Sequence, residues 1–213
     1  MNQIQIHSVA KVFDRPGVLE RVMTLVTKVA AMGLLPKSRR IEALDEDSFR
    51  VVLNSLQSGN LIGGRGPALF RIITALATGA STKEQIAELD RLLTTIEESP
   101  VPAKEWEAMR EIFDDEELSR FLDASTSSIK RYSAGERSTP VETADRLHWL
   151  AMVVADLAGS YNEFGIRRWF HRHRAQLDGK SPFEILGKNW SSDTEAAKRV
   201  RELARSLSAG GAT

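Results

Sequence analysis

The sequence predicts an all-α fold in three parts: a helical N-terminal region over residues 1–100, short helices over 104–159 and a small helical domain over 160–213. Three observations support this prediction. Apolar residues recur three and four positions apart along most of the chain, as on one face of a helix. The alternation typical of a strand is confined to residues 4–13. Capping signals precede many of the apolar stripes.

The composition permits a sizeable core and excludes a general affinity for polyanions. The chain has 213 residues, of which 42% are hydrophobic, and its formal net charge is +0. Charge is nevertheless uneven, with 12 acidic and 4 basic residues over 81–118, and 10 basic and 6 acidic residues over 160–213. Any contact with nucleic acid must therefore be local.

We expect a cytoplasmic protein with no membrane partner. The most apolar stretch, residues 18–35, is interrupted by Glu20, Arg21 and Lys28, so it is a poor candidate for a membrane span. The N-terminus lacks the basic and apolar segments of a signal peptide. The absence of cysteine excludes disulfides, thiolate zinc sites and a cysteine nucleophile.

Four helices are predicted in the N-terminal region. The first is capped by Asp14, opened by Pro16 and stopped by Gly33, and the second spans about 47–58. The third is opened by Pro67. The fourth begins at a capping box over residues 81–84 and ends before a linker at about 99–103.

A glycine-rich loop over residues 59–67 precedes the third predicted helix. Its exposed amides and Arg65 would suit a phosphate, but the loop lacks the Gly-Lys-Ser/Thr ending of a nucleotide-binding loop. A flexible turn between helices is the alternative interpretation, and we prefer it.

From Lys104 onward, short amphipathic helices alternate with tight turns. Asp114 or Asp115 can cap one helix, and residues 123–125 form a turn. The next helix is expected from Thr126 to about residue 134, with Ile129 facing inward and Gly135 ending it. This spacing predicts a helix-turn-helix.

The outward face of that last helix is the candidate DNA-contacting surface. Hydroxyls near a helix N-terminus and long cations can bind phosphates and base edges. No carboxylate occurs between residues 124 and 135, whereas residues 114–117 are all acidic, so we expect that acidic end to turn away from DNA. The alternative is a plain helical bundle with a solvated basic face. The candidate contacts are Ser125, Thr126, Ser127, Ser128, Lys130, Arg131 and Arg137.

A long helix follows, from a predicted capping box over residues 139–142, with proline at the first helical position, to about Gly159. Trp149, Met152 and Val153 widen its apolar face, so it is either wholly buried or shared with a second subunit. We interpret His148 as a packed or surface histidine rather than a metal ligand.

The C-terminal segment carries the most distinctive pattern. A basic helix ends near Arg172, and a turn at 178–179 reverses the chain. Ser181 caps a short helix that Pro182 opens and Glu184 closes in a capping box, and a last amphipathic helix spans about 193–208.

These motifs resemble a known family. Residues 116–122 and 127–137 are similar to the Xre/Cro-type helix-turn-helix, and residues 165–187 resemble the C-terminal domain of the MbcA/ParS/Xre antitoxins. The resemblance spans about 104–207 and does not include residues 1–100. The positions that match the C-terminal pattern are Arg167, Arg168, Trp169, Leu177, Gly179, Ser181 and Pro182.

The resemblance implies a homodimeric or larger DNA-binding antitoxin that represses its own promoter and neutralises a RES-like toxin, a class of protein that consumes NAD. Most of the matching residues are expected to hold the fold, with Trp169 and Leu177 buried. The expected partner contacts are the arginines of the basic segment, namely Arg167, Arg168, Arg172 and Arg174.

Other functions stay open or are disfavoured. We expect no enzyme, no cofactor and no metal site, since no catalytic motif is present and His171 and His173 lie two apart, on different faces of a helix. The alternative to an antitoxin is a toxin-independent DNA-binding regulator or an oligomeric scaffold. Residues 1–100 could mediate oligomerisation, bind another partner or provide a second DNA contact.

Overall fold

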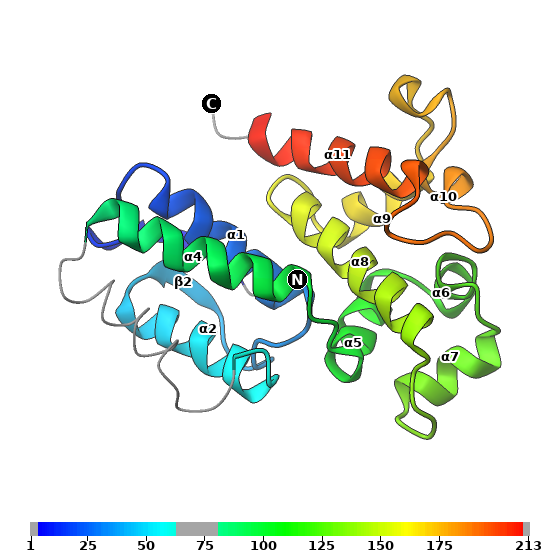
Figure 1. The fold of residues 1–213 in the computed structure, drawn as a ribbon, viewed down its shortest axis with the longest axis horizontal. Helices are drawn as coiled ribbons and strands as arrows, with labels where there is room; N and C mark the ends of the chain where they lie inside the picture. The colour runs from blue at the N-terminus through cyan, green and yellow to red at the C-terminus, as the bar shows by residue number, and fades with distance from the viewer. Residues whose placement is uncertain (1–3, 63–80, 211–213) are drawn as a thin grey trace. The chain divides into compact units, whose positions relative to one another are not determined.

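The computed structural model describes residues 4–62 and 81–210, and these are predominantly helical with one small sheet (Figure 1). This confirms the predicted all-α class. The chain divides into two compact units, which we call the N-terminal unit (2–99) and the C-terminal unit (100–213). The division falls at the predicted linker. The predicted boundary between residues 159 and 160 lies inside the C-terminal unit.

The N-terminal unit contains β1 (Ile4–Val9), α1 (Val18–Ala31), β2 (Ile41–Leu44), α2 (Glu46–Ser58) and α4 (Thr82–Glu97). Strands β1 and β2 pair in parallel, from Ile4 opposite Ile41 to Val9 opposite Leu44, and α1 makes the crossover between them. Strand β2 was not predicted from the sequence, because four residues are too few to show a period. The predicted helix opened by Pro67 lies outside the described residues, as does the loop from residue 63 onward.

Two of the three helix starts described in this unit follow capping boxes. Ser81 Oγ accepts from Glu84 N at 3.3 Å while Glu84 Oε2 accepts from Ser81 N at 2.9 Å, as predicted. Asp45 caps α2 through Ser48 N at 2.8 Å. Only the predicted start of α1 was wrong, because its N-cap is Gly17 in the left-handed region (φ 78°), with no side-chain cap. The backbone N–H of Val18 bonds to the carbonyl of Arg15 in a turn, so Asp14 and Pro16 precede the helix.

Helices α1 and α4 pack together through apolar and charged contacts. Lys28 is buried on α1, and its Nζ lies 3.1 Å from Glu97 Oε1 at the end of α4. Arg21 Nε lies 2.6 Å from Asp90 Oδ1, which adds a second ion pair between the two helices. The apolar core of this unit includes Phe13, Val22, Val26, Phe49, Leu53, Leu89 and Leu92.

Helices of very different length make up the C-terminal unit: α5 (Pro102–Ile112), α6 (Asp115–Leu122), α7 (Thr126–Ser133), α8 (Val141–Ala158), α9 (Glu163–His171), α10 (Pro182–Ile185) and α11 (Glu195–Gly210), with a 3₁₀ turn at Ala175–Leu177. The longest, α8, contacts α5, α6, α9 and α11. Trp149, Met152 and Val153 are all buried in this structure of a single chain. The wide apolar face of α8 is therefore covered without a second subunit.

One aromatic cluster joins the helix-turn-helix segment to the C-terminal segment. Phe121 of α6 lies edge-to-face against Phe170 of α9 at 5.2 Å and against Phe183 of α10 at 5.0 Å. The indole Nε1 of Trp190 donates to the carbonyl of Phe121 at 2.6 Å. Residues 104–159 and 160–213 thus share a core. Trp169 and Leu177 are buried in the C-terminal unit, as the sequence analysis expected.

The start of α8 differs from the prediction. Its N-cap is Pro140, with no side-chain cap, so the capping box expected at residues 139–142 does not form. Thr139 Oγ1 instead accepts a hydrogen bond from the indole Nε1 of Trp106 at 2.9 Å. The capping box of Ser181 and Glu184 forms as predicted, with Ser181 Oγ accepting from Glu184 N at 3.2 Å. In the described ranges, every helix is too short or too polar to cross a bilayer.

Candidate nucleic-acid interface

Helices α6 and α7 are two short helices joined by a tight turn, where the sequence analysis placed them. Asp114 caps α6 by accepting from Glu117 N at 2.9 Å, and Glu117 completes a capping box. The helix ends at Asp123, whose left-handed backbone (φ 50°) reverses the chain. Ser125 then caps α7 by accepting from Ser128 N at 3.2 Å. Local sequence therefore sets both ends of the turn.

Two buried side chains fix the orientation of α7. Ile129 is fully buried, and Tyr132 is buried with its ring centroid 6.2 Å from that of Trp106 on α5. Because residues three apart share a helix face, anchoring these two turns the opposite face outward. Lys130 and Arg131 are exposed on that face.

The predicted hydroxyl contacts lie at the N-terminal end of α7. Ser127 is exposed, whereas Thr126 and Ser128 are partly exposed. Ser125 Oγ lies 3.0 Å from Ser127 Oγ and donates to Ser128 Oγ at 2.9 Å, so these hydroxyls form one small cluster. Arg137 is exposed beyond the C-terminal end, with its guanidinium 5.7 Å from the centre of the Tyr132 ring. The structure thus brings the seven predicted residues onto α7 and its two flanks.

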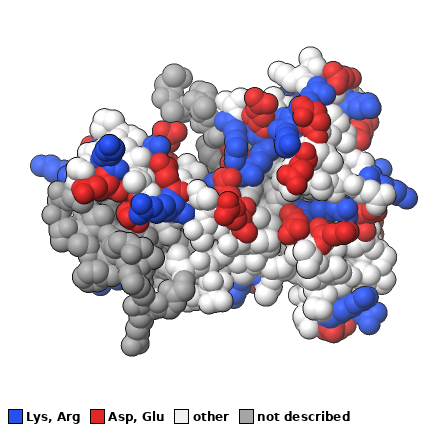
Figure 2. Space-filling model, viewed as in Figure 1, with Lys and Arg blue, Asp and Glu red and all other residues white. Residues whose placement is uncertain are grey.

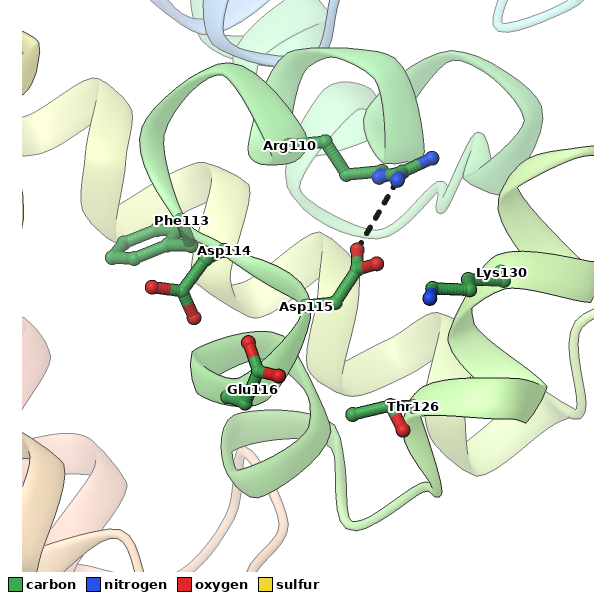
Figure 3. Close-up of a pocket in the computed structure, with 7 residues that line it drawn as sticks. All are labelled: Arg110, Phe113, Asp114, Asp115, Glu116, Thr126 and Lys130. Carbon is green, nitrogen blue, oxygen red and sulfur yellow. Dashed lines mark ion pairs between the residues drawn. The ribbon is translucent and has the colours of Figure 1, made fainter.

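A hollow of about 370 Å³ lies beside α7, and its lining joins α5, α6 and α7 (Figure 3). Thr126 and Lys130 contribute from α7, and Arg110 and Phe113 from α5 and its end. The acidic start of α6 forms the rest of the lining, with Asp114, Asp115 and Glu116. The expectation that this acidic end turns away from the candidate interface is therefore wrong.

Intramolecular cations bind three of the four carboxylates at the start of α6. Arg110 Nη2 lies 3.2 Å from Asp115 Oδ1, as Figure 3 shows. Arg167 of α9 pairs with Glu117, Nε to Oε2 at 2.9 Å, and also with Asp114. Both carboxylates raise the pKa of Arg167, and the hydrogen bond to Glu117 is the main cause.

His171 is a further partner of Glu117. Its Nε2 lies 2.5 Å from Glu117 Oε1. The pairings of Arg167 and His171 with α6 were not predicted from the sequence, because partners fifty or more residues apart leave no periodic signal. Basic and acidic side chains are intermixed on the face of the molecule that Figure 2 shows.

The four arginines predicted as partner contacts have different surroundings. Arg167 is engaged with α6, and the guanidinium of Arg174 lies 4.7 Å from the centre of the Trp169 ring. Burial lowers the pKa of Arg174. Arg168 and Arg172 are exposed, and Phe164, four residues before Arg168 on α9, is 73% exposed.

The three histidines of the C-terminal unit are each paired with a carboxylate. His148 is buried, in agreement with its interpretation as a packed residue, and its Nδ1 lies 2.6 Å from Oε1 of the buried Glu105 on α5. Burial raises the pKa of Glu105. His171 lies beside Glu117, and His173 Nε2 lies 3.2 Å from Glu184 Oε2. The described ranges contain no cluster of three metal-ligating side chains.

Together, the fold and this site define a two-unit, predominantly helical protein with a helix-turn-helix pair whose second helix exposes cations and hydroxyls. Such a face can bind an anionic partner by charge and hydrogen bonding. Comparisons with protein-family models, curated proteins and solved structures each found no match.

Proposed function

We propose that the C-terminal unit binds duplex DNA by placing α7 in the major groove. The observation that carries this proposal is the two-sided character of α7. Ile129 and Tyr132 are buried, and the opposite face exposes Lys130, Arg131 and Ser127 with no carboxylate on the helix. A helix-turn-helix uses its second helix in this way, and its N-terminal residues contact base edges.

The exposed side chains suit different parts of the duplex. Lys130 and Arg131 are long enough to reach guanine O6 and N7 or a phosphate. The hydroxyls of Thr126 and Ser127 lie at the helix N-terminus, a position that favours phosphate oxygens. One short helix contacts few base pairs, so we propose that two copies bind together, as is usual for such modules.

The test is a titration of duplex DNA, by gel shift or fluorescence anisotropy, with the upstream region of the protein's own gene and a scrambled duplex. Lys130→Ala and Arg131→Ala should each weaken binding by about 1–3 kcal/mol for a base-edge contact, and less for a phosphate contact. Raising the salt concentration should weaken binding strongly, because bound cations release counterions from the duplex.

Lys198→Ala is the matched control, because Lys198 is an exposed lysine on α11 of the same unit. It removes the same charge and should leave affinity nearly unchanged. Unchanged affinity in both α7 variants, or an equal loss in the control, would move the DNA-binding surface elsewhere. Sedimentation of the free and bound protein checks the proposed pairing.

We also propose that the exposed side of α9 binds a partner protein, and the resemblance suggests a RES-like toxin as that partner. Phe164 and Arg168 support this proposal, because an exposed aromatic beside an arginine is typical of the centre of a protein interface. A protein that neutralised such a toxin and bound its own promoter would be an autoregulated antitoxin. A toxin-independent regulator or scaffold is the alternative.

Co-purification with the product of the neighbouring gene distinguishes these alternatives. Phe164→Ala and Arg168→Ala should release the partner while leaving DNA binding unchanged. Removing α11 is a poor test, because Ala197, Val200 and Ala204 of α11 are fully buried and their loss would unfold the unit. Failure of any RES-like protein to bind the wild-type chain would favour the toxin-independent alternative.

A further inference from the structure

The acidic start of α6 is an obstacle to the DNA contact proposed for α7. Four consecutive carboxylates, residues 114–117, occupy the first turn, and three of them line the same hollow as Thr126 and Lys130. A phosphate that approaches α7 therefore also approaches these carboxylates. At about 0.1 M salt, charges interact over roughly 10 Å, so uncompensated carboxylates there would repel the duplex.

The obstacle is offset by arginines that belong to two neighbouring helices. From α5, Arg110 binds Asp115 at 3.2 Å and also donates to Ser133 Oγ of α7 at 3.0 Å. From α9, Arg167 binds both Asp114 and Glu117. Glu117 is buried and Asp114 is exposed, so a single guanidinium joins an inner and an outer carboxylate. Two arginines thus bind three of the four acidic groups.

We propose that Arg167 is a positioning residue for DNA binding: from α9 it binds two carboxylates in the first turn of α6 and reduces their repulsion, so that a phosphate backbone can approach α7. This inference rests on the proposed DNA-binding function. It assigns Arg167 a role inside the molecule, in contrast to the partner contact that the sequence suggested. It also makes the DNA affinity of α7 depend on α9, a helix of the segment that resembles the antitoxin C-terminal domain.

The adjacent residue provides a matched control. Arg168 is exposed on the same helix, and Arg168→Gln removes the same charge one position away. At about 0.1 M salt, Arg167→Gln should weaken DNA binding roughly three- to tenfold more than Arg168→Gln does, and the difference should shrink as salt rises. Arg167→Lys, which keeps the charge, should retain most of the wild-type affinity.

A charge-rescue variant separates neutralisation from other roles. Asn is a good N-cap, and Gln serves at the third helical position of a capping box, so Asp114→Asn and Glu117→Gln remove the carboxylates and keep the start of α6. Combining both with Arg167→Gln removes the three charges of this network and leaves Asp115 with its partner Arg110. This triple variant should recover the wild-type affinity for DNA, and thermal unfolding should show that it folds.

The outcomes are distinct. If Arg167 touched DNA directly, the triple variant would bind as weakly as Arg167→Gln, which would overturn the inference. Equal affinity of Arg167→Gln and Arg168→Gln would also overturn the inference. In that case, weaker binding by Lys130→Ala would still support the proposed function. If the wild-type chain failed to bind any duplex at low salt, both proposals would fall.

Discussion

At the scale of single residues, the structure's least expected feature is the pair of Glu105 and His148. Both side chains are buried, on α5 and α8, with Glu105 Oε1 2.6 Å from His148 Nδ1. Glu105 Oε2 is buried without a hydrogen-bond partner. A buried carboxylate is costly when ionised, and burial accordingly raises its pKa despite the opposing effect of His148. The pair therefore makes folding sensitive to pH.

The first prediction concerns that sensitivity. A carboxyl group whose pKa is raised by folding stabilises the native state most when protonated, so its contribution declines as pH rises through the folded-state pKa. We expect the wild type to lose stability relative to Glu105→Gln as pH rises from about 4 toward neutrality, starting near the ordinary carboxyl pKa. Urea unfolding of both proteins at a series of pH values measures this difference.

Glu105→Ala is the companion variant, because it removes the hydrogen bond between Glu105 and the buried His148. It should be less stable than Glu105→Gln, which can still hydrogen-bond to the imidazole. The stability difference between wild type and Glu105→Gln could instead stay constant, or grow in favour of wild type as pH rises. Either result would contradict the raised pKa of Glu105 in the folded state.

At the scale of elements, helix starts show how far local signals reach. The boxes of Ser81 with Glu84 and Ser181 with Glu184 form as predicted. The start of α8 has a similar sequence pattern and does not form a capping box, because Thr139 Oγ1 instead accepts a hydrogen bond from the indole Nε1 of Trp106. Trp106 is 2% exposed, so its N–H needs a partner from within the protein. A tertiary hydrogen bond outcompetes a local cap at this position.

The second prediction follows from that competition. Thr139→Ala removes the acceptor of the buried indole N–H and should cost about 1–3 kcal/mol of stability, whereas Thr139→Ser keeps the hydroxyl and should cost little. The effects of Thr139→Ala and Trp106→Phe should be non-additive, since both remove the same hydrogen bond. Chemical denaturation of the four proteins in this double-mutant cycle measures the coupling. Strict additivity would support the cap that the sequence pattern suggested.

At the scale of the whole molecule, the important fact is that the helix-turn-helix is not a separate domain. It shares a core with α9 and α10 through Phe121, Phe170 and Phe183, and α11 packs on α8. The division of the chain instead lies between residues 99 and 100. A protein built this way is expected to unfold in two steps, one for each unit.

The third prediction tests this organisation. A fragment of residues 100–213 should fold with a cooperative transition and should retain the DNA affinity of the full chain, because the proposed contacts and the residues that position them lie within it. A fragment of residues 100–159 should fail to fold, because it lacks Phe170, Phe183 and the buried positions of α11. Calorimetry and circular dichroism measure both outcomes. Cooperative folding of the shorter fragment would contradict the shared core.

The sequence by itself determined the features that depend on neighbouring residues. Helical periodicity set the all-α class. The left-handed turn residue Asp123 ends α6, and the N-cap Ser125 begins α7. It also determined the exposed face of α7, because Ile129 marks the inward side and the remaining positions follow from the period of the helix.

Only the tertiary structure decided which distant groups meet. It paired Arg167 with Glu117 and Glu105 with His148, and gave β2 its place beside β1. It also placed the acidic start of α6 beside α7, where the sequence analysis had expected the reverse. The physical reason is that hydrogen bonds and ion pairs act over a few ångströms in space and carry no sequence period, so the packing of helices selects the partners.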